Sequence, residues 1–462
     1  MTDIEQERLV FERAASHATT YLAGIRSRVV APADEAVTRL RSFATEAPEE
    51  PMDPVDVIDL LDAVGSPATV ANAGGRYFGF VNGGALPAAR AAAVLAAAWD
   101  QNAAMRVMSP VAAALEDVTI GWMIALLGLP AGSGCGFVTG ATVANVTCLA
   151  AARHALLARH GWDVEAAGLF GAPPITVVLG DEAHVSVRKA LAILGLGRDR
   201  VVVVPADGQG RLDARQLPAL DRSTIVCLQA GNVNTGAFDP FGDVCAAARA
   251  SGAWVHVDGA FGLWALASRA YDTLTRGAAD ADSWATDAHK WLNVPYDCGL
   301  AFVRDADALR SAMSMQAAYL TAGHAREPMH WTPDASRRAR GVEVWAALRS
   351  LGRRGLIDLM DRTCRHARRF AGALRAAGHE VRNDVVLNQV LVSFGDDATT
   401  TRVIEGVQRD RTCWCGATIW KGRAAMRISV SSWATTDEDV DLSVAAILRI
   451  AEGAMLERGA GL

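Results

Sequence analysis

The chain has 462 residues, of which 51% are hydrophobic and 21% are charged, and its formal net charge is −6. This composition is that of a folded globular protein, and the length predicts two or three domains. The slightly acidic balance excludes the basic footprint of a protein that binds nucleic acid or an anionic membrane surface. No uninterrupted apolar stretch reaches membrane-spanning length, and the N-terminus lacks the pattern of a signal peptide.

The eight cysteines have no spacing typical of a disulfide framework. Cys413 and Cys415 form a C-x-C pair, but no second pair or histidine cluster accompanies them, so we expect no metal site. The cysteine pattern therefore favours a reducing, cytoplasmic location.

The N-terminal part predicts a helical arm. A helical segment is expected over about 4–43, and the prolines and acids of 44–56 predict a linker or a sharp turn. We divide the chain into an N-terminal helical arm and dimerisation segment at 1–70, a large α/β domain at 71–335 and a small α+β domain at 336–462.

From about residue 115, predicted helices alternate with short apolar strands. Strands are expected near residues 137, 177, 203, 226, 256 and 301, and a turn region is expected over 283–292. Continuous apolar strands are typical of strands buried on both faces, which predicts a largely parallel sheet wrapped by helices. Ligands of such sheets bind at the carboxyl ends of the strands.

The last part of the chain has a different pattern. A long helix is expected over 342–356, a strand within 385–395 and a helix near 400–410. A strand beginning near 426 precedes a helix that starts at Thr436 or Asp437, both of which are good N-cap residues. This pattern predicts a smaller α+β domain.

An amine and an acid follow two of the predicted strands. The chain contains only three lysines, and Lys290 lies in the crowded segment DAHKWL, 32 residues after Asp258, which ends the strand AWVHVD. Alone, Asp258 is most simply a hydrogen-bonded strand-end carboxylate. Together, the pair supplies what pyridoxal 5′-phosphate (PLP) requires, namely a nucleophilic amine for its aldehyde and a carboxylate for its ring nitrogen.

A phosphate cradle is a further requirement of this cofactor. Thr139, Gly140, Ala141 and Thr142 lie where a strand turns into a long helix, whose N-terminal amides and dipole favour an anion. Taken alone, small residues here also permit close helix packing.

Three other residues suit the same cofactor. His184 follows a strand and can stack on the ring, although a lone loop histidine is more often structural. Ala260 is small enough to contact the opposite ring face, and His289 can donate to the phosphate or be a core histidine.

These motifs resemble those of the group II PLP-dependent amino acid decarboxylases, a family that includes aromatic-amino-acid, glutamate and diaminobutyrate decarboxylases. The resemblance runs from about residue 50 to the C-terminus. It is carried by the segments FVTGATVAN, DEAHVSVRKALAILGLG, HVDGAFG, DSWATDAHKWLNVPYDCG and MRISVSSWATTDEDVD. The family implies an α/β fold, the PLP-dependent transferase fold type I, with PLP as the cofactor.

The resemblance also implies roles for single residues. Lys290 is expected to condense with the cofactor aldehyde, Asp258 to pair with the pyridinium and His184 to stack on the ring. Asn232 falls where relatives place a residue near the ring hydroxyl.

Further roles concern the phosphate and the substrate. Ala141, Thr142 and His289 are expected to contact the phosphate. Arg427 matches the arginine that binds the substrate carboxylate in relatives, although without the family it is most simply a strand arginine paired with an acid. Aromatic residues of RYFGFVNGG, notably Phe78 and Phe80, are candidates for a substrate pocket or for core positions.

The chain departs from the family pattern at two informative places. Asp287 stands where several relatives have asparagine. In family members, a tyrosine on a loop returns a proton to the substrate carbon. The corresponding segment of this chain, which follows Tyr319, contains no tyrosine. His330 or His324 is a candidate for the missing acid.

Three functions remain open at this point. The first is decarboxylation of an L-amino acid, with an apolar or aromatic side chain suggested by the pocket candidates, to an amine and carbon dioxide. The second is a decarboxylation-coupled oxidation to an aldehyde, or another PLP transferase or lyase reaction. The third is a non-catalytic, cofactor-binding relative. The family also implies a homodimer, and the charge balance predicts no nucleic acid or membrane partner.

Overall fold

The computed structural model describes residues 2–314 and 325–460, with side chains described as far as residue 456. By its internal contacts the chain divides into two compact units. The first unit comprises 1–82, 369–382 and 391–462, and the second comprises 83–368 and 383–390. The segments 1–70, 71–335 and 336–462, which the sequence predicts as domains, stay predictions.

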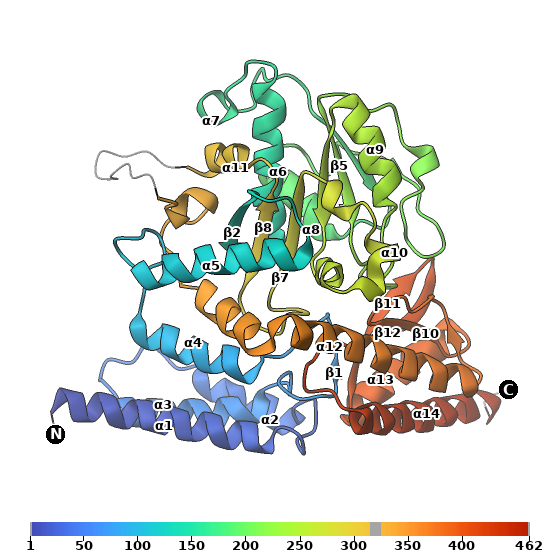
Figure 1. Ribbon diagram of the computed structural model, residues 1–462. Coiled ribbons are helices and arrows are strands. Elements are labelled where there is room, and N and C mark those ends of the chain that lie inside the picture. Colours follow the sequence, from blue (N-terminus) through green and yellow to red (C-terminus); the bar gives the residue numbers. More distant parts are fainter. Residues whose placement is uncertain (1, 315–324, 461–462) are drawn as a thin grey trace. The chain divides into compact units, whose positions relative to one another are not determined.

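A seven-stranded sheet forms the centre of the second unit (Figure 1). Its order is β2-β8-β7-β6-β5-β3-β4, in which β7, β6, β5, β3 and β4 are parallel and β8 is antiparallel to both neighbours. The strands are β2 (Gly134–Val138), β3 (Thr176–Gly180), β4 (Val202–Val204), β5 (Thr224–Gln229), β6 (Trp254–Asp258), β7 (Ser283–Asp287) and β8 (Gly299–Val303). The predicted, largely parallel sheet is therefore confirmed.

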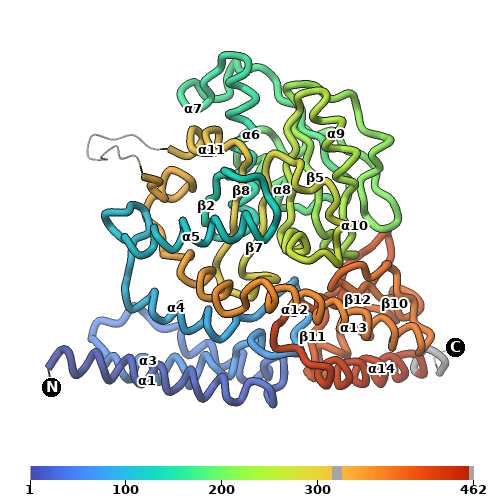
Figure 2. Tube along the Cα trace, in the orientation of Figure 1, coloured from blue at the N-terminus to red at the C-terminus, as the bar shows by residue number. Residues whose placement is uncertain are grey.

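Burial explains why these short segments are strands. Every residue of β2, β5, β6, β7 and β8 is buried, as expected for strands covered on both faces. Helix α6 (Ala141–Ala158) packs across β6, β7 and β8, beside α8 (Val185–Ile193) and α11 (Ala306–Met313). Figure 2 shows the same arrangement along the Cα trace.

Two helices, α6 and α5 (Pro110–Leu127), are long and apolar enough by composition to cross a bilayer. In α6, 61% of the apolar window is buried inside the protein. Its apolar composition is thus accounted for by packing on the sheet.

The prediction of a turn region over 283–292 is wrong for its first half, because Ser283–Asp287 forms β7. The segment SWATD has three polar residues and lacks a continuous apolar run. It is a strand because β6 and β8 pair with it on both sides. Tertiary pairing thus overrides local propensity here.

The second unit also contains several shorter helices and most of one long helix. They are α4 (Pro87–Trp99), α7 (Val164–Ala167), α9 (Phe241–Ser251), α10 (Asp272–Thr275) and the larger part of α12 (Gly341–Ala376). Gly352 interrupts α12 with φ 59° and ψ −179°, a backbone conformation that glycine adopts more readily than other residues.

The first unit contains helices α1 (Asp3–Gly24), α2 (Asp34–Arg39) and α3 (Pro54–Gly65). The predicted helical segment over 4–43 is therefore broken after residue 24, and Pro32, which has no amide hydrogen, lies in the break. Helices α1 and α3 pack together, and His17 joins them through its contacts with Asp59 and Asp62.

A five-stranded sheet completes the first unit, in the order β1-β11-β12-β10-β9. Its strands are β1 (Tyr77–Phe78), β9 (Glu380–Val381), β10 (Gln389–Ser393), β11 (Trp414–Trp420) and β12 (Arg423–Ser429). Helix α13 (Asp397–Asp410) packs on β11 and β12 and against α14 (Asp437–Ala460). The predicted strand and N-capped helix near residues 426–437 are confirmed, with Thr436 accepting from the amide of Asp439.

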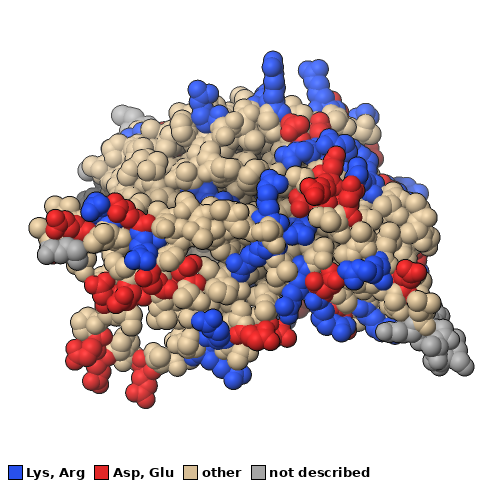
Figure 3. Space-filling view, turned by 90° about the horizontal axis from the view of Figure 1, so that it is seen from below, with Lys and Arg blue, Asp and Glu red and all other residues tan. Residues whose placement is uncertain are grey.

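On the face drawn in Figure 3, the side chains of lysine and arginine are interspersed with those of aspartate and glutamate. This face has no broad patch of a single sign, in line with the net charge of −6.

Candidate active site

Two buried carboxylates mark the carboxyl ends of the neighbouring parallel strands β6 and β7. Asp258 is the last residue of β6 and Asp287 the last of β7, and their side chains are 3% and 2% exposed. The loop after β6 is fixed to β7, because the amide of Gly259 donates to Ala285 and the amide of Asp287 donates to Ala260. The two acids therefore lie at the same edge of the sheet, where ligands of such sheets bind.

Asp258 is surrounded by uncharged donors. Its Oδ2 accepts from Asn145 Nδ2 and from Ser186 Oγ, both at 3.2 Å. Its Oδ1 accepts from the backbone amide of Ala260 at 3.2 Å. A buried carboxylate needs such donors because burial alone disfavours its charge.

His184, the predicted stacking residue, is the N-cap of α8. Its Nδ1 accepts from the amide of Ser186 at 3.2 Å and lies 2.7 Å from the hydroxyl of the same serine. Since that hydroxyl also reaches Asp258, the histidine and the carboxylate share one side-chain partner. A narrow cavity is lined in part by both residues.

Asp287 is surrounded by donors of a different kind. Its Oδ2 lies 2.9 Å from Lys290 Nζ and 3.6 Å from His289 Nε2. Its Oδ1 accepts at 2.6 Å from the amide of Ala141, the first residue of α6. The predicted phosphate cradle and the predicted nucleophile therefore meet at this carboxylate.

The cradle is tightly built. A Cβ on Gly140 would lie 3.3 Å from His289 Cε1, and a Cβ on Gly299 would lie 2.5 Å from backbone atoms of Gly140. Only glycine at 299 permits this approach of β8 to the turn before α6. Thr139 and Thr142 flank Gly140 and Ala141 in the same turn and are half-buried.

A hydrogen bond to the ring of His289 holds this side chain in place. Its Nδ1 accepts from the amide of Cys298 at 3.1 Å, so the neutral ring carries its proton on Nε2, which faces Asp287. Burial lowers the pKa of His289, and Asp287 opposes that shift. At neutral pH the ring therefore offers one donor toward the cradle.

Asn232 provides a test of the predicted cofactor. It is fully buried three residues after β5, and its Oδ1 accepts from the amides of Asn234 and Thr235. Its Nδ2 has no hydrogen-bond partner among the described residues. A buried donor left without a partner is costly, and a ring hydroxyl would satisfy it. The amine, the acid, the helix N-terminus and this donor together fit PLP.

The candidates for the catalytic acid and for the substrate pocket lie in other segments of the chain. His330 lies in a short 3-10 helix at Pro328–Trp331 of the second unit, whereas Tyr319 and His324 fall outside the described residues. Phe78 is buried in the first unit with its ring centroid 5.0 Å from that of Phe370. Its neighbour Phe80 is 60% exposed and stacks on Trp414.

Arg427 lies on β12 of the first unit, where burial lowers its pKa. Its Nε has no hydrogen-bond partner in the described part of the chain. The roles of Arg427, Phe78, Phe80 and His330 in substrate binding or catalysis stay predictions.

The sequence reasoning missed three residues that support Asp258, namely Asn145, Ser186 and His256. Asn145 and His256 had a signal in their spacing, although the spacing does not show that the two residues are joined. Asn145 lies one helical turn after Ala141 on an apolar helix, and His256 precedes Asp258 by two positions on the same strand face.

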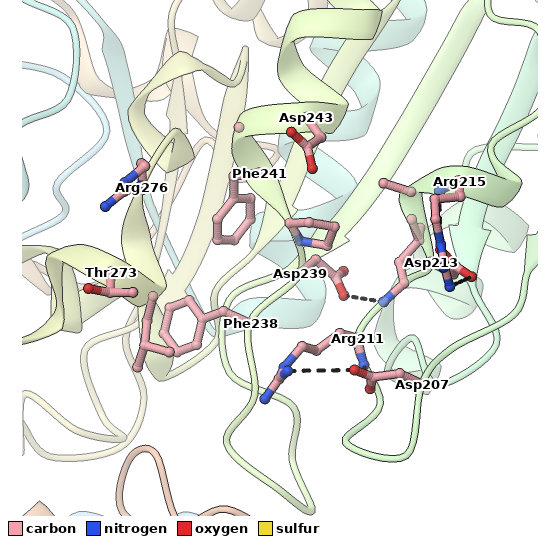
Figure 4. A pocket seen from close by; sticks show the side chains of 15 residues that line it. Asp207, Arg211, Asp213, Arg215, Phe238, Asp239, Phe241, Asp243, Thr273 and Arg276 are labelled. Atoms are coloured by element: carbon pink, nitrogen blue, oxygen red, sulfur yellow. Dashed lines mark hydrogen bonds and ion pairs between the residues drawn. The ribbon is translucent and has the colours of Figure 1, made fainter.

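A larger hollow of about 650 Å³ lies elsewhere in the second unit (Figure 4). Arg211 and Asp207 on its wall pair with each other, and the buried Asp239 accepts from the backbone amides of Leu212 and Gln229. Burial raises the pKa of Asp239 to about 7. The lining contains neither Lys290 nor Asp258, although Asp239 lines both this hollow and the narrow cavity beside His184 and Asp258.

Comparison with known proteins identifies the class. The family model described as "Pyridoxal-dependent decarboxylase conserved domain" matches residues 66–394. The chain belongs to this family, and its cofactor is PLP. This membership confirms the resemblance seen in the sequence motifs.

Individual relatives give the same family. The chain is 32% identical over 271 residues to the acidic amino acid decarboxylase of Mus musculus, covering 55% of this chain and 48% of that protein. It is 32% identical over 303 residues to L-2,4-diaminobutyrate decarboxylase of Rhizobium meliloti, covering 62% of this chain and 58% of that protein. The chain thus spans about half the length of the curated relatives it matches.

The fold is also that of the family. The crystal structure of Oryza sativa TDC with PLP and tryptamine superposes with a TM-score of 0.90 at 22% identity, covering 98% of this chain and all of the other. This likeness confirms the predicted fold type I of the PLP-dependent transferases.

Proposed function

We propose that this protein decarboxylates an L-amino acid to the corresponding amine and carbon dioxide. The observation that carries the proposal is the joint placement of Lys290, Asp258 and the N-terminus of α6 at one sheet edge. When bound, PLP supplies an electron-accepting pyridinium ring on which the bond to the α-carboxylate of an attached amino acid can break.

The residues of this chain have distinct tasks in that reaction. Lys290 provides the primary amine that holds the cofactor and is exchanged for the substrate amine. Asp258 keeps a positive charge on the ring nitrogen, because a buried carboxylate favours a paired cation. The amide of Ala141 and the ring of His289 offer donors to the phosphate.

Arg427 is proposed to bind the substrate carboxylate. Its buried guanidinium, with one nitrogen lacking a partner among the described residues, suits an anionic ligand. The aromatic stack of Tyr77, Phe80 and Trp414, with centroid distances of 5.1 and 5.4 Å to the tryptophan, supports an apolar or aromatic substrate. The two curated relatives are named for acidic amino acids and for L-2,4-diaminobutyrate, whereas the Oryza sativa structure contains tryptamine, so an unbiased substrate search is needed.

The test is a panel of the common L-amino acids, including 2,4-diaminobutyrate, incubated with the PLP-loaded protein. Carbon dioxide release and mass spectrometry of the products should identify one preferred amine. Borohydride reduction should fix the cofactor to Lys290, and the Lys290→Ala variant should lose this label while Lys189→Ala keeps it. No turnover of any panel member by a fully loaded protein would overturn the proposal.

A second outcome is motivated by the loop sequence. Residues 320–335 contain no tyrosine. His330 is the histidine of this segment that lies among the described residues. If no protein group returned a proton to the carbon that has lost carbon dioxide, molecular oxygen would accept two electrons and become peroxide, and water would then release the aldehyde and ammonia in place of the amine. Measuring amine, aldehyde and peroxide in one incubation separates the two outcomes.

We propose further that the protein is a cytoplasmic homodimer. Helix α1 has 22 residues, none of them buried, and exposes Ile4, Leu9 and Phe11. Ile4 and Phe11 lie seven residues apart and therefore on one side of the helix, and this exposed apolar pair supports a second copy as the partner. The eight cysteines are all buried free thiols, which supports a reducing compartment. Light scattering should give the mass of two chains, and Phe11→Glu should shift it toward one.

A further inference from the structure

Behind Asp258, four buried side chains form a continuous hydrogen-bonded series. Trp254 Nε1 lies 2.9 Å from Ser283 Oγ, which lies 2.9 Å from His256 Nδ1. His256 Nε2 lies 2.9 Å from Asn145 Oδ1, and Asn145 Nδ2 lies 3.2 Å from Asp258 Oδ2. The series crosses three elements, β6, β7 and α6, and each of its members is at most 3% exposed.

The chemistry of the two ends fixes the direction of every bond. An indole N–H only donates, so Ser283 accepts from Trp254 and directs its own proton to His256 Nδ1. A carboxylate only accepts, so Asn145 turns its amide nitrogen to Asp258 and its oxygen to His256. The neutral ring must then carry its proton on Nε2. The opposite tautomer would place two acceptors face to face.

The histidine is uncharged in this setting. Burial lowers its pKa to about 4, against a smaller opposing effect of Asp258. The residue opposite it on β5 is Cys227, whose pKa burial raises to about 12, so this thiol is neutral as well. His256 and Cys227 therefore place no charge within the series, which ends at the carboxyl group of Asp258.

We propose that Trp254, Ser283, His256 and Asn145 act as a one-way donor relay that holds Asp258 as an oriented anion, which makes His256 a positioning residue of the cofactor site. The inference rests on the proposed function for its catalytic meaning. Each bond polarises the next in the same sense, so the relay strengthens the donor at Asp258 without placing a competing cation there. The carboxylate thus keeps its charge for the cofactor ring nitrogen.

A relay and a packed core make different predictions for a graded set of variants. Trp254→Phe, Ser283→Ala, His256→Leu and Asn145→Leu remove donors at decreasing distance from Asp258. We expect their effect on PLP affinity to rise along this order, from about twofold to more than tenfold. His256→Gln retains a donor and an acceptor and should stay within a fewfold of the unchanged protein. Val255→Ala, on the opposite face of β6, is the control for lost packing.

Two readouts besides turnover decide the matter. The first is the pH at which the absorbance of bound PLP reports loss of the ring-nitrogen proton, which should fall in His256→Leu but not in Val255→Ala. The second is the ¹⁵N spectrum of the histidine-labelled full chain, with the His256 signal assigned by its loss in His256→Gln. We expect a neutral ring protonated on Nε2 at pH 7.

The two readouts separate failure of the relay from failure of the proposed function. The tautomer is read on the full chain whether or not PLP is added, and a proton on Nδ1 or a charged ring at pH 7 overturns the relay. Equal effects of His256→Leu and Val255→Ala on the absorbance midpoint overturn it too. Failure of every amino acid to react, with the relay signatures intact, overturns only the decarboxylase proposal.

Discussion

The two strand-end carboxylates of this protein lie at equivalent positions of neighbouring strands but have different kinds of hydrogen-bond and ion-pair partners. Among the described residues, Asp258 receives hydrogen bonds from the uncharged donors of Asn145, Ser186 and the backbone of Ala260. Asp287 contacts the ammonium of Lys290 and lies within reach of a histidine ring and a helix N-terminus. Neutral donors stabilise a carboxylate without cancelling its charge, whereas cations neutralise it.

This difference teaches how one sheet edge can serve both ends of a cofactor. The acid without a cation remains available to pair with a new positive charge, which is what a pyridinium nitrogen requires. Asp287 already contacts the ammonium of Lys290 and the amide of Ala141, so it competes for these groups with an arriving anion such as a phosphate. The positions of the two acids on the sheet therefore bring both of them to the cofactor site, whereas the groups that contact each acid determine which part of the cofactor it can bind.

The largest effect is expected on the Asp287 side, at the amine. Lys290→Arg keeps a cation beside Asp287 but removes the primary amine, so turnover should fall by about 10⁴-fold or more. Lys189→Arg, on the exposed surface of α8, is the matched control and should change turnover by less than about twofold. Steady-state rates at saturating PLP provide the measurement. Retention of turnover in Lys290→Arg would remove the amine from the mechanism.

A comparison of the same substitution at both acids follows in size. Asp258→Asn should reduce the turnover number by about 10³-fold, because the amide cannot hold the ring nitrogen protonated. Asp287→Asn should reduce the turnover number far less, since Asp287 contacts Lys290 and the turn before α6 and is not the partner of the ring nitrogen. Rates are compared at saturating PLP for both variants. Equal reductions of the turnover number would show that the two acids have the same function, which would contradict the proposed difference between them.

The strand-end site could be predicted because its signals are local. Asp258 closes an apolar strand, and the segment DAHKWL carries Lys290 and His289 within a few residues. The fold class followed in the same way, from apolar strands alternating with helices. The relay through Asn145 and His256 could not be predicted, because it depends on how α6 lies across β6 and β7.

The errors in the predicted elements have physical reasons as well. The strand β11, Trp414–Trp420, was not predicted from the sequence, because Gly416 and Thr418 interrupt the apolar run of WCGATIW. It is a strand because β12 pairs with it over five residues. The strand β7 is likewise imposed by its two neighbours. A sequence pattern indicates which secondary structure a segment favours. Where that preference is weak, pairing with neighbouring strands determines the structure.

Acid stability should distinguish the histidine behind Asp258. Its pKa in the folded protein is about 4, below the usual value of 6.5, so the unfolded chain binds more protons between these pH values. Stability from this group is complete above pH 6.5 and is lost as the pH falls toward 4. Between pH 7.5 and pH 5 the loss should be about 2 kcal/mol.

Asp239 has the opposite dependence, since its raised pKa of about 7 stabilises the fold at low pH and loses that effect as the pH rises. Measuring His256→Gln beside the unchanged protein cancels this contribution. The stability gap between the two, from denaturant midpoints, should narrow as the pH falls to 5. A gap independent of pH would mean that His256 is protonated alike in the folded and unfolded chain.

The smallest expected effect concerns the competition at Asp287. In Asp287→Asn, the amide of Ala141 and Lys290 no longer have a carboxylate partner, so a phosphate meets less negative charge at the N-terminus of α6. PLP should bind about three- to tenfold more tightly, as expected for one charge near a helix end. Pyridoxal, which lacks the phosphate, should bind with nearly unchanged affinity. Asp282→Asn, just before the other end of β7, is the control for charge alone, and both ligands are followed by absorbance titration. If the substitution changes the affinities for PLP and pyridoxal equally, Asp287 acts on the aldehyde end through Lys290 and not on the phosphate.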